Sequence, residues 1–272
     1  TYLFKDEDGK YWRLYDFIEQ SLCLQAAEQP SDFYESAVAF GRFQRQLAEF
    51  PADTLHETIP NFHNTRKRYE KLLASVAEDK AGRAASVREE IDFLLSVQEK
   101  ACTLTDLNQA GKLPLRVTHN DTKINNVLFH PETKEAMVVI DLDTVMPGLV
   151  GHDFGDAIRF AANYVMEDSR EYEKSGVNLE VFRAFSEGFL SMTAKTLTQN
   201  EIDTLALSCF VLTAELATRF LADYLDGDLY FNIKCPDHNL VRTRCQIALA
   251  KDMLKKMDEM EKVVRDCVAA AK

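Results

Sequence analysis

Apolar residues recur every three or four positions over most of the chain after residue 30. This spacing predicts amphipathic helices, each of which buries its apolar face. Ser31, Ser86 and Thr198 stand where an N-cap is expected, and each of the last two is followed three residues later by a glutamate, as in a capping box. Pro51 is expected to end the first helix. The predicted helices cover residues 31–50, 66–77, 86–102, 178–195, 198–225 and 237–268.

Short runs of β-branched and aromatic residues stand apart from these helices. Near the N-terminus, two such runs flank the turn Asp6–Gly9, which predicts a β-hairpin within residues 2–18 closed by an Asp-Gly turn. In the middle of the chain, residues 115–118, 127–129 and 136–140 are strand candidates. Because helix dominates and the strands are few, the pattern predicts an α+β fold that is mostly helical.

The composition is that of a globular protein with enough apolar residues for a full core. The chain has 272 residues, 46% of them hydrophobic, and a formal net charge of −12. Nucleic acids and anionic membrane surfaces bind through basic surfaces of a protein. Because this chain is acidic, neither is expected as a partner. The six cysteines are widely separated and lack the spacing of zinc ligands, which favours a reducing, cytoplasmic location.

The most apolar segment, residues 205–221, is interrupted by Glu215 and Arg219. A membrane-spanning helix seldom carries such charges, and no signal peptide opens the chain, so a buried helix is expected here. Because the two charged residues are four positions apart on a helix, one interpretation is that they form a buried ion pair.

A cluster of polar residues, HNDTKINN at positions 119–126, lies between two strand candidates. It has the H-x-D-x-K-x-x-N spacing of a kinase catalytic loop. Phosphoryl transfer requires a carboxylate near the acceptor hydroxyl, oxygen ligands for Mg²⁺ and cations near the phosphates. Asp121 can accept the hydroxyl proton, and Lys123 can neutralise charge on the phosphoryl group. Asn126, together with Asp141 at the end of the next strand candidate, can bind Mg²⁺ through oxygen.

Other polar residues of this region have structural interpretations as well. His119 is expected to be a packed support for the loop, and Asp156 is a candidate to cap or tether it. Asp143 is predicted to lie on the same strand as Asp141 and to face the same side. It would be a further metal ligand or would anchor the ligands that bind the metal. His56 and His63 are interpreted as packed or exposed loop residues and are left outside the site.

These motifs resemble those of the aminoglycoside phosphotransferase and choline kinase family, whose members phosphorylate small molecules and have a protein-kinase-like fold. Within that group, the sequence looks closest to the bacterial N-acetylhexosamine 1-kinases. The matching blocks lie between Thr118 and Gln246. They read THNDTKINNVLF, VIDLDTVMPG, DFGDAIRF, ELATRFLADYLDGDLYF and DHNLVRTRCQ.

The resemblance implies a protein-kinase-like large lobe, mostly helical, with a remnant of the small β lobe. Residues 1–19 would be the remnant hairpin and linker of the small ATP-binding lobe, and residues 20–272 would be the helical catalytic lobe. ATP and Mg²⁺ are implied as cofactors. In the linker, Asp16, Phe17 and Ile18 are implied to contact the adenine of ATP.

The resemblance also assigns an acceptor site and a metal site. Phe160, Arg219 and Tyr230 are implied to bind the acceptor sugar. The run Asp153–Gly155 mimics the D-F-G metal motif of protein kinases. Because it lies well after the strand that ends at Asp141, the metal role is assigned to Asp141.

The sequence therefore predicts an ATP- and Mg²⁺-dependent kinase whose small-molecule acceptor is a sugar hydroxyl, expected to be an N-acetylhexosamine at its anomeric position. An aminoglycoside kinase or a choline or ethanolamine kinase is the alternative within the family. A pseudokinase that binds a ligand without turnover is the alternative of another class. Because no glycine-rich phosphate loop or strand lysine precedes the hairpin at Tyr2, the chain is expected to be truncated, and to fold but be inactive alone.

Overall fold

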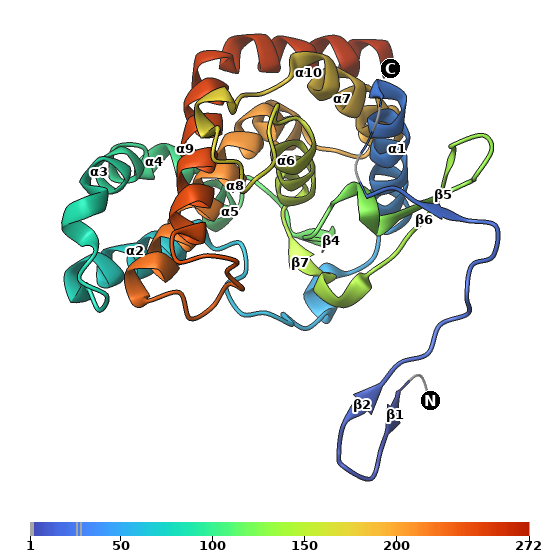
Figure 1. Cartoon of the computed structure of the whole chain (residues 1–272). Helices are drawn as coiled ribbons and strands as arrows, with labels where there is room; N and C mark the ends of the chain where they lie inside the picture. Colours follow the sequence, from blue (N-terminus) through green and yellow to red (C-terminus); the bar gives the residue numbers. More distant parts are fainter. Residues whose placement is uncertain (1–2, 26, 28, 272) are drawn as a thin grey trace.

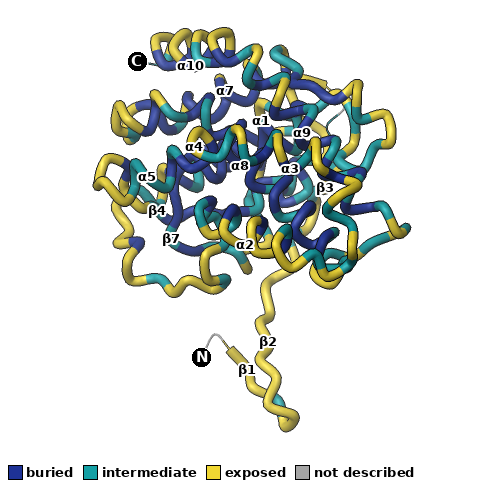
Figure 2. Tube along the Cα trace, turned by 90° about the vertical axis from the view of Figure 1, so that its left-hand side faces the viewer, coloured by how far each residue is buried: buried dark blue, intermediate teal, exposed yellow. Residues whose placement is uncertain are grey.

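The structure is a computed structural model in which residues 3–25, 27 and 29–271 are described. A body of helices forms most of the molecule, and a short N-terminal hairpin projects from it on an extended, exposed segment (Figures 1 and 2). Thr1 and Tyr2, at the start of the predicted hairpin, lie outside the described residues.

The hairpin consists of β1 (Phe4–Lys5) and β2 (Tyr11–Trp12), which pair antiparallel, so this prediction is confirmed. The turn between them is held by Asp6, whose carboxylate accepts hydrogen bonds from a backbone N–H and from the indole of β2. Through Arg13, which follows β2, the hairpin forms an ion pair with Asp143 of the body.

The helices of the body gather around the long helix α8. By length and composition α8 alone among the described helices could cross a membrane, yet 83% of its most apolar window is buried inside the protein. It is therefore a core helix, as its interrupting charges predicted. The helices are α1 (Pro30–Gln46), α2 (Thr65–Glu78), α3 (Arg88–Ser96), α4 (Gln98–Ala101), α5 (Thr103–Gln109), α6 (Val150–Ala161), α7 (Leu179–Thr193), α8 (Gln199–Asp226), α9 (His238–Lys255) and α10 (Met257–Ala271).

Two small antiparallel sheets lie beside the helices. One has the strand order β3 (Leu22–Cys23), β5 (Val127–Phe129), β6 (Ala136–Val139), and the other pairs β4 (Arg116–Thr118) with β7 (Met146–Gly148). All three strands predicted in the middle of the chain are confirmed, whereas β3 and β7 were not predicted. Because β4 pairs with β7 and not with β5, the loop between β4 and β5 connects the two sheets.

The helix starts agree with the predictions in part. Thr198 caps α8 in a capping box, since its hydroxyl accepts a hydrogen bond from the Glu201 N–H and the Glu201 carboxylate accepts one from the Thr198 N–H. Ser31, however, is not the cap of α1. That helix begins at Pro30 with Gln29 as its N-cap, because proline lacks only an N–H that would be unpaired in the first turn anyway.

Two predicted helices are broken in the structure. In the segment 86–102, Ser86 lies in a short 3₁₀ turn, and its hydroxyl donates to the Arg83 carbonyl oxygen instead of capping a helix. The segment 237–268 is divided at Lys256 into α9 and α10. The segment 86–102 is also divided at Val97, between α3 and α4. Buried apolar residues lie on both sides of each break. The core is curved, so a straight helix would move away from it, and the bends keep the apolar face of each segment in contact with the core.

Helices α1 and α7 approach each other closely because each has a glycine at the contact. A Cβ atom on Gly41 would lie only 2.8 Å from the carbonyl oxygen of Phe189, and one on Gly188 would collide with the carbonyl oxygen of Tyr34. This close packing fixes the position of α1, whose residue Gln44 forms a hydrogen bond with Asp153 of α6.

Candidate active site

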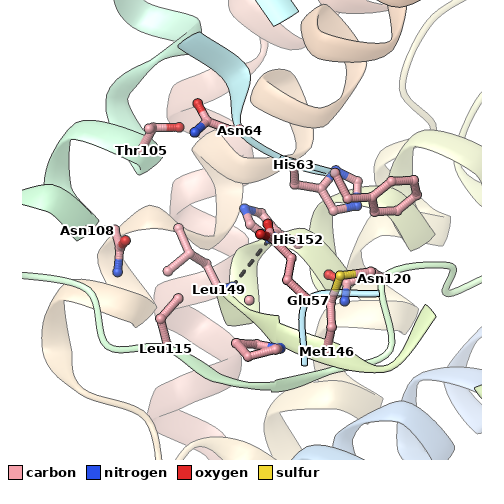
Figure 3. A pocket seen from close by; sticks show the side chains of 13 residues that line it. Glu57, His63, Asn64, Thr105, Asn108, Leu115, Asn120, Met146, Leu149 and His152 are labelled. Carbon is pink, nitrogen blue, oxygen red and sulfur yellow. Dashed lines mark hydrogen bonds between the residues drawn. The ribbon is translucent and has the colours of Figure 1, made fainter. Parts of the chain in front are cut away.

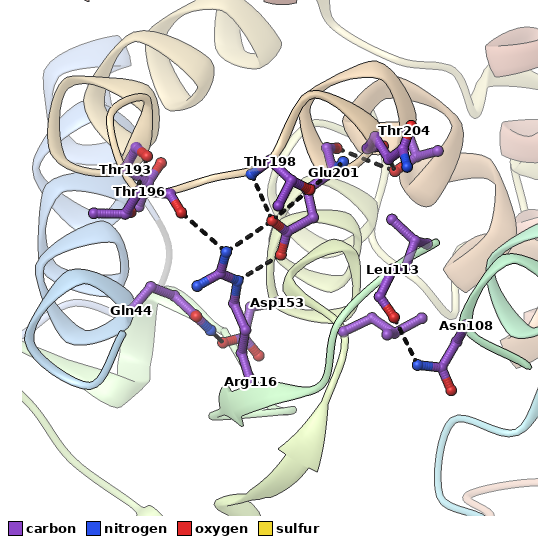
Figure 4. A network of polar contacts seen from close by, with 12 residues as sticks. Gln44, Asn108, Leu113, Arg116, Asp153, Thr193, Thr196, Thr198, Glu201 and Thr204 are labelled. Atoms are coloured by element: carbon purple, nitrogen blue, oxygen red, sulfur yellow. Dashed lines mark hydrogen bonds and ion pairs between the residues drawn. The ribbon is translucent and has the colours of Figure 1, made fainter. Parts of the chain in front are cut away.

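One buried carboxylate holds the start of the loop between β4 and β5. Asp153, in the first turn of α6, is 1% exposed. It accepts hydrogen bonds from the backbone N–H groups of His119 (3.0 Å) and Asn120 (2.7 Å) and from the side-chain amide of Gln44 (2.6 Å, Figure 4). Burial raises the pKa of the Asp153 carboxyl, and these donors oppose the rise by favouring the ionised form. Asp153 therefore fixes the loop to both α6 and α1.

The first two loop residues are buried and fully engaged. Asn120 has a left-handed backbone with φ of 64°, and its amide donates to the carbonyl oxygen of Thr144 at 3.0 Å, which helps to hold this unfavourable conformation. The His119 ring accepts the Asp121 N–H at Nδ1 (3.3 Å), and its Nε2 donates to the Ile140 carbonyl oxygen (2.9 Å). These contacts agree with the predicted role of His119 as a packed support.

The loop brings together the three polar side chains that its spacing singled out. The Lys123 ammonium lies 2.6 Å from one Asp121 carboxylate oxygen. The Asn126 amide donates to the other oxygen at 3.1 Å and to the Asp121 carbonyl oxygen at 2.8 Å. On the side of β3, the Cys23 thiol donates to the carbonyl oxygen of Asn125 at 3.3 Å. The Asp121 carboxylate is thus oriented by one cation and one amide while it remains partly exposed.

A second anchor lies at the start of β4, the strand that leads into the loop. Arg116 donates to the Glu201 carboxylate (2.8 Å) and to the Thr196 carbonyl oxygen (3.0 Å), as Figure 4 shows. Glu201 is the same residue that completes the capping box of α8. The strand that positions the loop is therefore fixed to the N-terminus of the core helix.

Asp141 follows β6 and lies beside Asn126, because the Ile140 N–H donates to the Asn126 carbonyl oxygen at 2.9 Å. Its carboxylate is exposed and, among the described contacts, forms no hydrogen bond or ion pair. The predicted common face with Asp143 is wrong, because residues 142–144 form a 3₁₀ turn and not a strand. The Asp143 carboxylate instead forms the ion pair with Arg13 beside the hairpin.

A cavity of about 240 Å³ opens beside Asp121 and Lys123. Helices α6, α8 and α9 and the segment before α2 complete its wall. Asp156 does not tether the loop as predicted, because its carboxylate accepts hydrogen bonds from Arg159 (2.8 and 3.0 Å). Arg159 also donates to Glu167 at 2.6 Å. The carboxylates of this wall are therefore engaged by neighbouring cations.

Residues 4–185 match the model of the phosphotransferase enzyme family. The match covers more than half of the chain and includes every loop residue described above. The chain belongs to the phosphotransferase enzyme family. The family part of the sequence-based resemblance is thereby confirmed.

Several solved structures are similar in fold to this chain. Plasmodium vivax ethanolamine kinase matches with a TM-score of 0.53 and 12% identity, over 84% of this chain and 64% of that one. A Ralstonia eutropha protein described as a candidate aminoglycoside phosphotransferase matches with a TM-score of 0.54 and 13% identity, over 99% and 77%. Choline kinase from Cryptosporidium parvum matches with a TM-score of 0.51 and 15% identity, over 98% and 76%.

These similarities establish the fold. The chain spans 64% of the length of the ethanolamine kinase. The predicted α+β, mostly helical, kinase-like fold is confirmed.

The three residues implied to bind the acceptor line different cavities of the structure. Arg219 lines the cavity that contains Asp121. Tyr230 is 69% exposed and borders a separate hollow that Arg219 also lines. Phe160 lines a third cavity on the other side of Arg159. Of the three, only Arg219 lines the same cavity as Asp121.

The residues implied to contact adenine lie in the extended segment between the hairpin and the body. Phe17 is 88% exposed, Asp16 is exposed and Ile18 is partly buried. Within the described part of the chain, the side chains of these three residues form no hydrogen bond or ion pair. Their assignment to ATP stays a prediction.

His63 was left out of the predicted site, but the structure places it in the wall of the cavity. Its Nδ1 donates to the Glu215 carboxylate at 2.9 Å, and the Thr65 hydroxyl donates to the same carboxylate at 2.7 Å. Glu215 thus pairs with His63 and not with Arg219, whose guanidinium lies over the ring of Phe62 at 5.3 Å. No local signal reveals this pair, because 152 positions separate its members.

His63 and Asn120 also line another cavity, which Figure 3 shows. The ring of His152 stacks obliquely on that of His63, with 4.8 Å between the ring centroids. Burial and the neighbouring His63 lower the pKa of His152 to about 3, so it is neutral at physiological pH. Its Nδ1 accepts the Leu149 N–H at 3.3 Å. His152 therefore supports the back of the wall without adding charge.

The Glu215 pair predicts a pH dependence of stability. Burial would raise the pKa of Glu215, but His63 and the hydrogen bonds from His63 and Thr65 outweigh it and lower the pKa from its ordinary 4.5 to about 2. The ionised carboxylate therefore stabilises the fold above pH 4.5, and this contribution is lost as the pH falls toward 2. We expect the difference in unfolding free energy between wild type and Glu215→Gln to shrink over that range. Urea denaturation at a series of pH values measures it, and a difference independent of pH would contradict the assignment.

Proposed function

We propose that this chain forms the catalytic part of an ATP- and Mg²⁺-dependent kinase that phosphorylates a sugar hydroxyl. The expected acceptor is an N-acetylhexosamine, phosphorylated at its anomeric position. The observation that carries the proposal is the Asp121 carboxylate, which Lys123 and Asn126 orient at the mouth of a cavity of about 240 Å³. A carboxylate in that position suits the activation of an acceptor hydroxyl.

The charges in the cavity wall favour a neutral acceptor over a cationic one. Four carboxylates and four cationic side chains line the cavity, so they balance formally. The carboxylates are engaged by Lys123, Arg159 and His63, whereas Arg219 and Arg242 have no carboxylate partner among the described ion pairs. A choline or aminoglycoside cation would meet these two arginines and find few free carboxylates. The carboxylates are Asp121, Asp156, Glu167 and Glu215, and the cations are Lys123, Arg159, Arg219 and Arg242.

The residues around Asp121 support a simple division of roles. Asp121 accepts the proton of the acceptor hydroxyl while that oxygen attacks the γ-phosphorus, and Lys123 reduces the negative charge that develops nearby. The loop conformation that allows this is fixed in advance by Asp153 and Asn120. Such preorganisation lowers the cost of orienting the reacting groups.

Asn126 and Asp141 fit the ligand type of Mg²⁺. Both offer oxygen, and the Asp141 carboxylate is exposed at the same end of β5 and β6. Among the described residues, no three His, Cys, Asp or Glu side chains form a metal cluster. A site with few protein ligands is typical of Mg²⁺ that is bound together with substrate phosphates, whose charge it neutralises.

We expect Asp141→Ala to raise the Mg²⁺ concentration needed for half-maximal activity by at least about tenfold, because a negatively charged ligand is lost. Asp121→Asn should leave that concentration nearly unchanged, because it removes the base and not a metal ligand. Titration of Mg²⁺ at saturating ATP and acceptor measures both values. Equal metal dependence of the two variants would sink this division of roles.

The acceptor is tested by ADP release in the protein that carries this chain. N-acetylglucosamine, N-acetylgalactosamine, glucose, choline, ethanolamine and kanamycin are compared at equal concentration. We expect turnover with the N-acetylhexosamines, and loss of the reducing-end signal of the product because its anomeric oxygen is blocked. Faster turnover of a cationic acceptor would instead favour the choline or aminoglycoside alternative. Nucleotide binding without turnover of any acceptor would favour a pseudokinase.

A further inference from the structure

Helix α9 contains a buried amide that has no hydrogen-bond partner. The side chain of Gln246 is in a residue that is 1% exposed, and neither its Oε1 nor its Nε2 has a partner among the described residues. A buried amide normally forms hydrogen bonds, because it loses those to water on folding. An orphaned amide on the wall of a cavity therefore points to a ligand.

Gln246 lines the cavity of about 430 Å³ that also contains Phe160. Arg242, one turn earlier on α9, lines the same cavity, and its Nε is likewise buried without a partner. Asn163, another polar residue of the wall, is already engaged, since its Oδ1 accepts the Ser175 hydroxyl at 2.9 Å. Among the described residues of the wall, the buried polar atoms without a hydrogen-bond partner are thus the Oε1 and Nε2 of Gln246 and the Nε of Arg242.

The rest of the wall is mixed. Phe160, Tyr164 and Met166 contribute apolar surface. The carboxylates of Glu167 and Asp168 also line the cavity and are paired with Arg159 and Lys234. A ligand group that fits it therefore has one polar edge, which faces Gln246, and one apolar surface.

This cavity adjoins the one that contains Asp121. Arg159, Glu167 and Arg242 line both cavities, and Ile124 of the catalytic loop lines the second. A molecule whose hydroxyl reaches Asp121 can therefore extend a substituent past Arg159 toward Gln246.

We propose that this cavity is a subsite for an amide substituent of the acceptor, recognised by Gln246. The proposal rests on the function proposed above. The carbonyl oxygen of a secondary amide can accept a hydrogen bond from the Nε2 of Gln246. The methyl group of an N-acetyl substituent then contacts the apolar side of the cavity.

Other substituents satisfy this site less well. An ammonium group, as in an unacylated amino sugar, has no acceptor for Nε2, and the carboxylates of the wall, Glu167 and Asp168, are already paired with Arg159 and Lys234. A hydroxyl group in the same position is smaller and leaves the apolar side unfilled. The selective ligand class is therefore an N-acylated sugar.

The test measures binding by isothermal titration calorimetry to the protein that carries this chain, with N-acetylglucosamine, glucosamine and glucose as probes. Wild type should prefer N-acetylglucosamine to glucose by about tenfold or more, because a site built around a buried amide discriminates against a ligand that leaves it unpaired. Gln246→Leu should reduce this preference to less than about twofold, mainly by weakening N-acetylglucosamine binding.

Two further variants separate recognition from folding. Gln246→Leu without ligand should unfold at the same or a higher temperature than wild type, because leucine removes an orphaned buried amide. Gln246→Glu keeps the size of the side chain but loses the donor, so it should also lose the preference. Thr243→Val removes a buried hydroxyl of α9 that donates to the Asn239 carbonyl oxygen of its own helix, and it should keep the preference.

An undiminished preference in folded Gln246→Leu, or an equal loss of affinity for N-acetylglucosamine and glucose, would overturn the proposal. Phosphorylation of N-acetylglucosamine that is insensitive to Gln246→Leu would do the same while the proposed function stands. If no acceptor is phosphorylated, the proposed function fails, but the binding preference still decides the role of Gln246.

Discussion

Replacing Asp121 with asparagine is expected to lower kcat by about 10²- to 10⁴-fold, the usual contribution of a general base. Asparagine keeps the size of the side chain and an oxygen that can accept the hydrogen bond from Asn126, so the loop should retain its shape. What it cannot do is accept the proton of the acceptor hydroxyl. Nucleotide affinity should change little, because Asp121 is assigned to the acceptor and not to the phosphates.

The comparison uses kcat from ADP release and nucleotide Kd from fluorescence titration, with Asp53→Asn as the control. Asp53 is an exposed carboxylate in a short 3₁₀ turn, so its replacement should leave both values within about twofold. If Asp121→Asn retains most of the wild-type kcat, the base lies elsewhere. If it weakens nucleotide binding as strongly as kcat, Asp121 contacts the nucleotide.

The second large effect is expected at Asp153, which lies outside the cavity that contains Asp121. Asp153→Ala should destabilise the protein by about 3–5 kcal/mol, because it leaves the buried N–H groups of His119 and Asn120 and the amide of Gln44 without an acceptor. It should also lower kcat in the folded fraction, since the left-handed backbone of Asn120 loses its support.

Urea denaturation and kcat, measured under conditions where each variant is folded, test this. Asp153→Asn should be nearly as damaging, because its NH₂ group would face a backbone donor. Asp203→Asn, on an exposed position of α8, serves as the control and should change stability by less than about 0.5 kcal/mol. A loss below about 1 kcal/mol in Asp153→Ala would mean that the loop does not depend on this carboxylate.

The sequence predicted what short-range spacing determines. The positions of Asp121, Lys123 and Asn126 within six residues are enough to bring their side chains together, because a loop between two strands has little freedom. The capping box of α8 is similarly local, since Thr198 and its partner are three residues apart. The roles of these loop residues in catalysis stay predictions.

Contacts between distant segments could not be predicted in this way. Asp153 was recognised only as a mimic of a metal motif, and Asp156 was considered for the tethering role that Asp153 occupies. Which of two carboxylates on α6 meets the loop depends on how that helix is rotated against α8, and packing sets that rotation. The pairing of β4 with β7 and the contact of His63 with Glu215 depend on the same packing.

The bond between Cys23 and the carbonyl oxygen of Asn125 has a practical consequence. Of the six cysteines, all within the described residues, Cys23 is exposed and Cys235 is partly buried, while the others are buried. A thiol-reactive fluorophore should therefore attach first at Cys23, and Cys235→Ser would make the labelling selective. The dye would then stand next to the residue that precedes Asn126, the proposed metal ligand. Its emission would report the ordering of this loop as nucleotide and Mg²⁺ arrive, with no cysteine introduced by design.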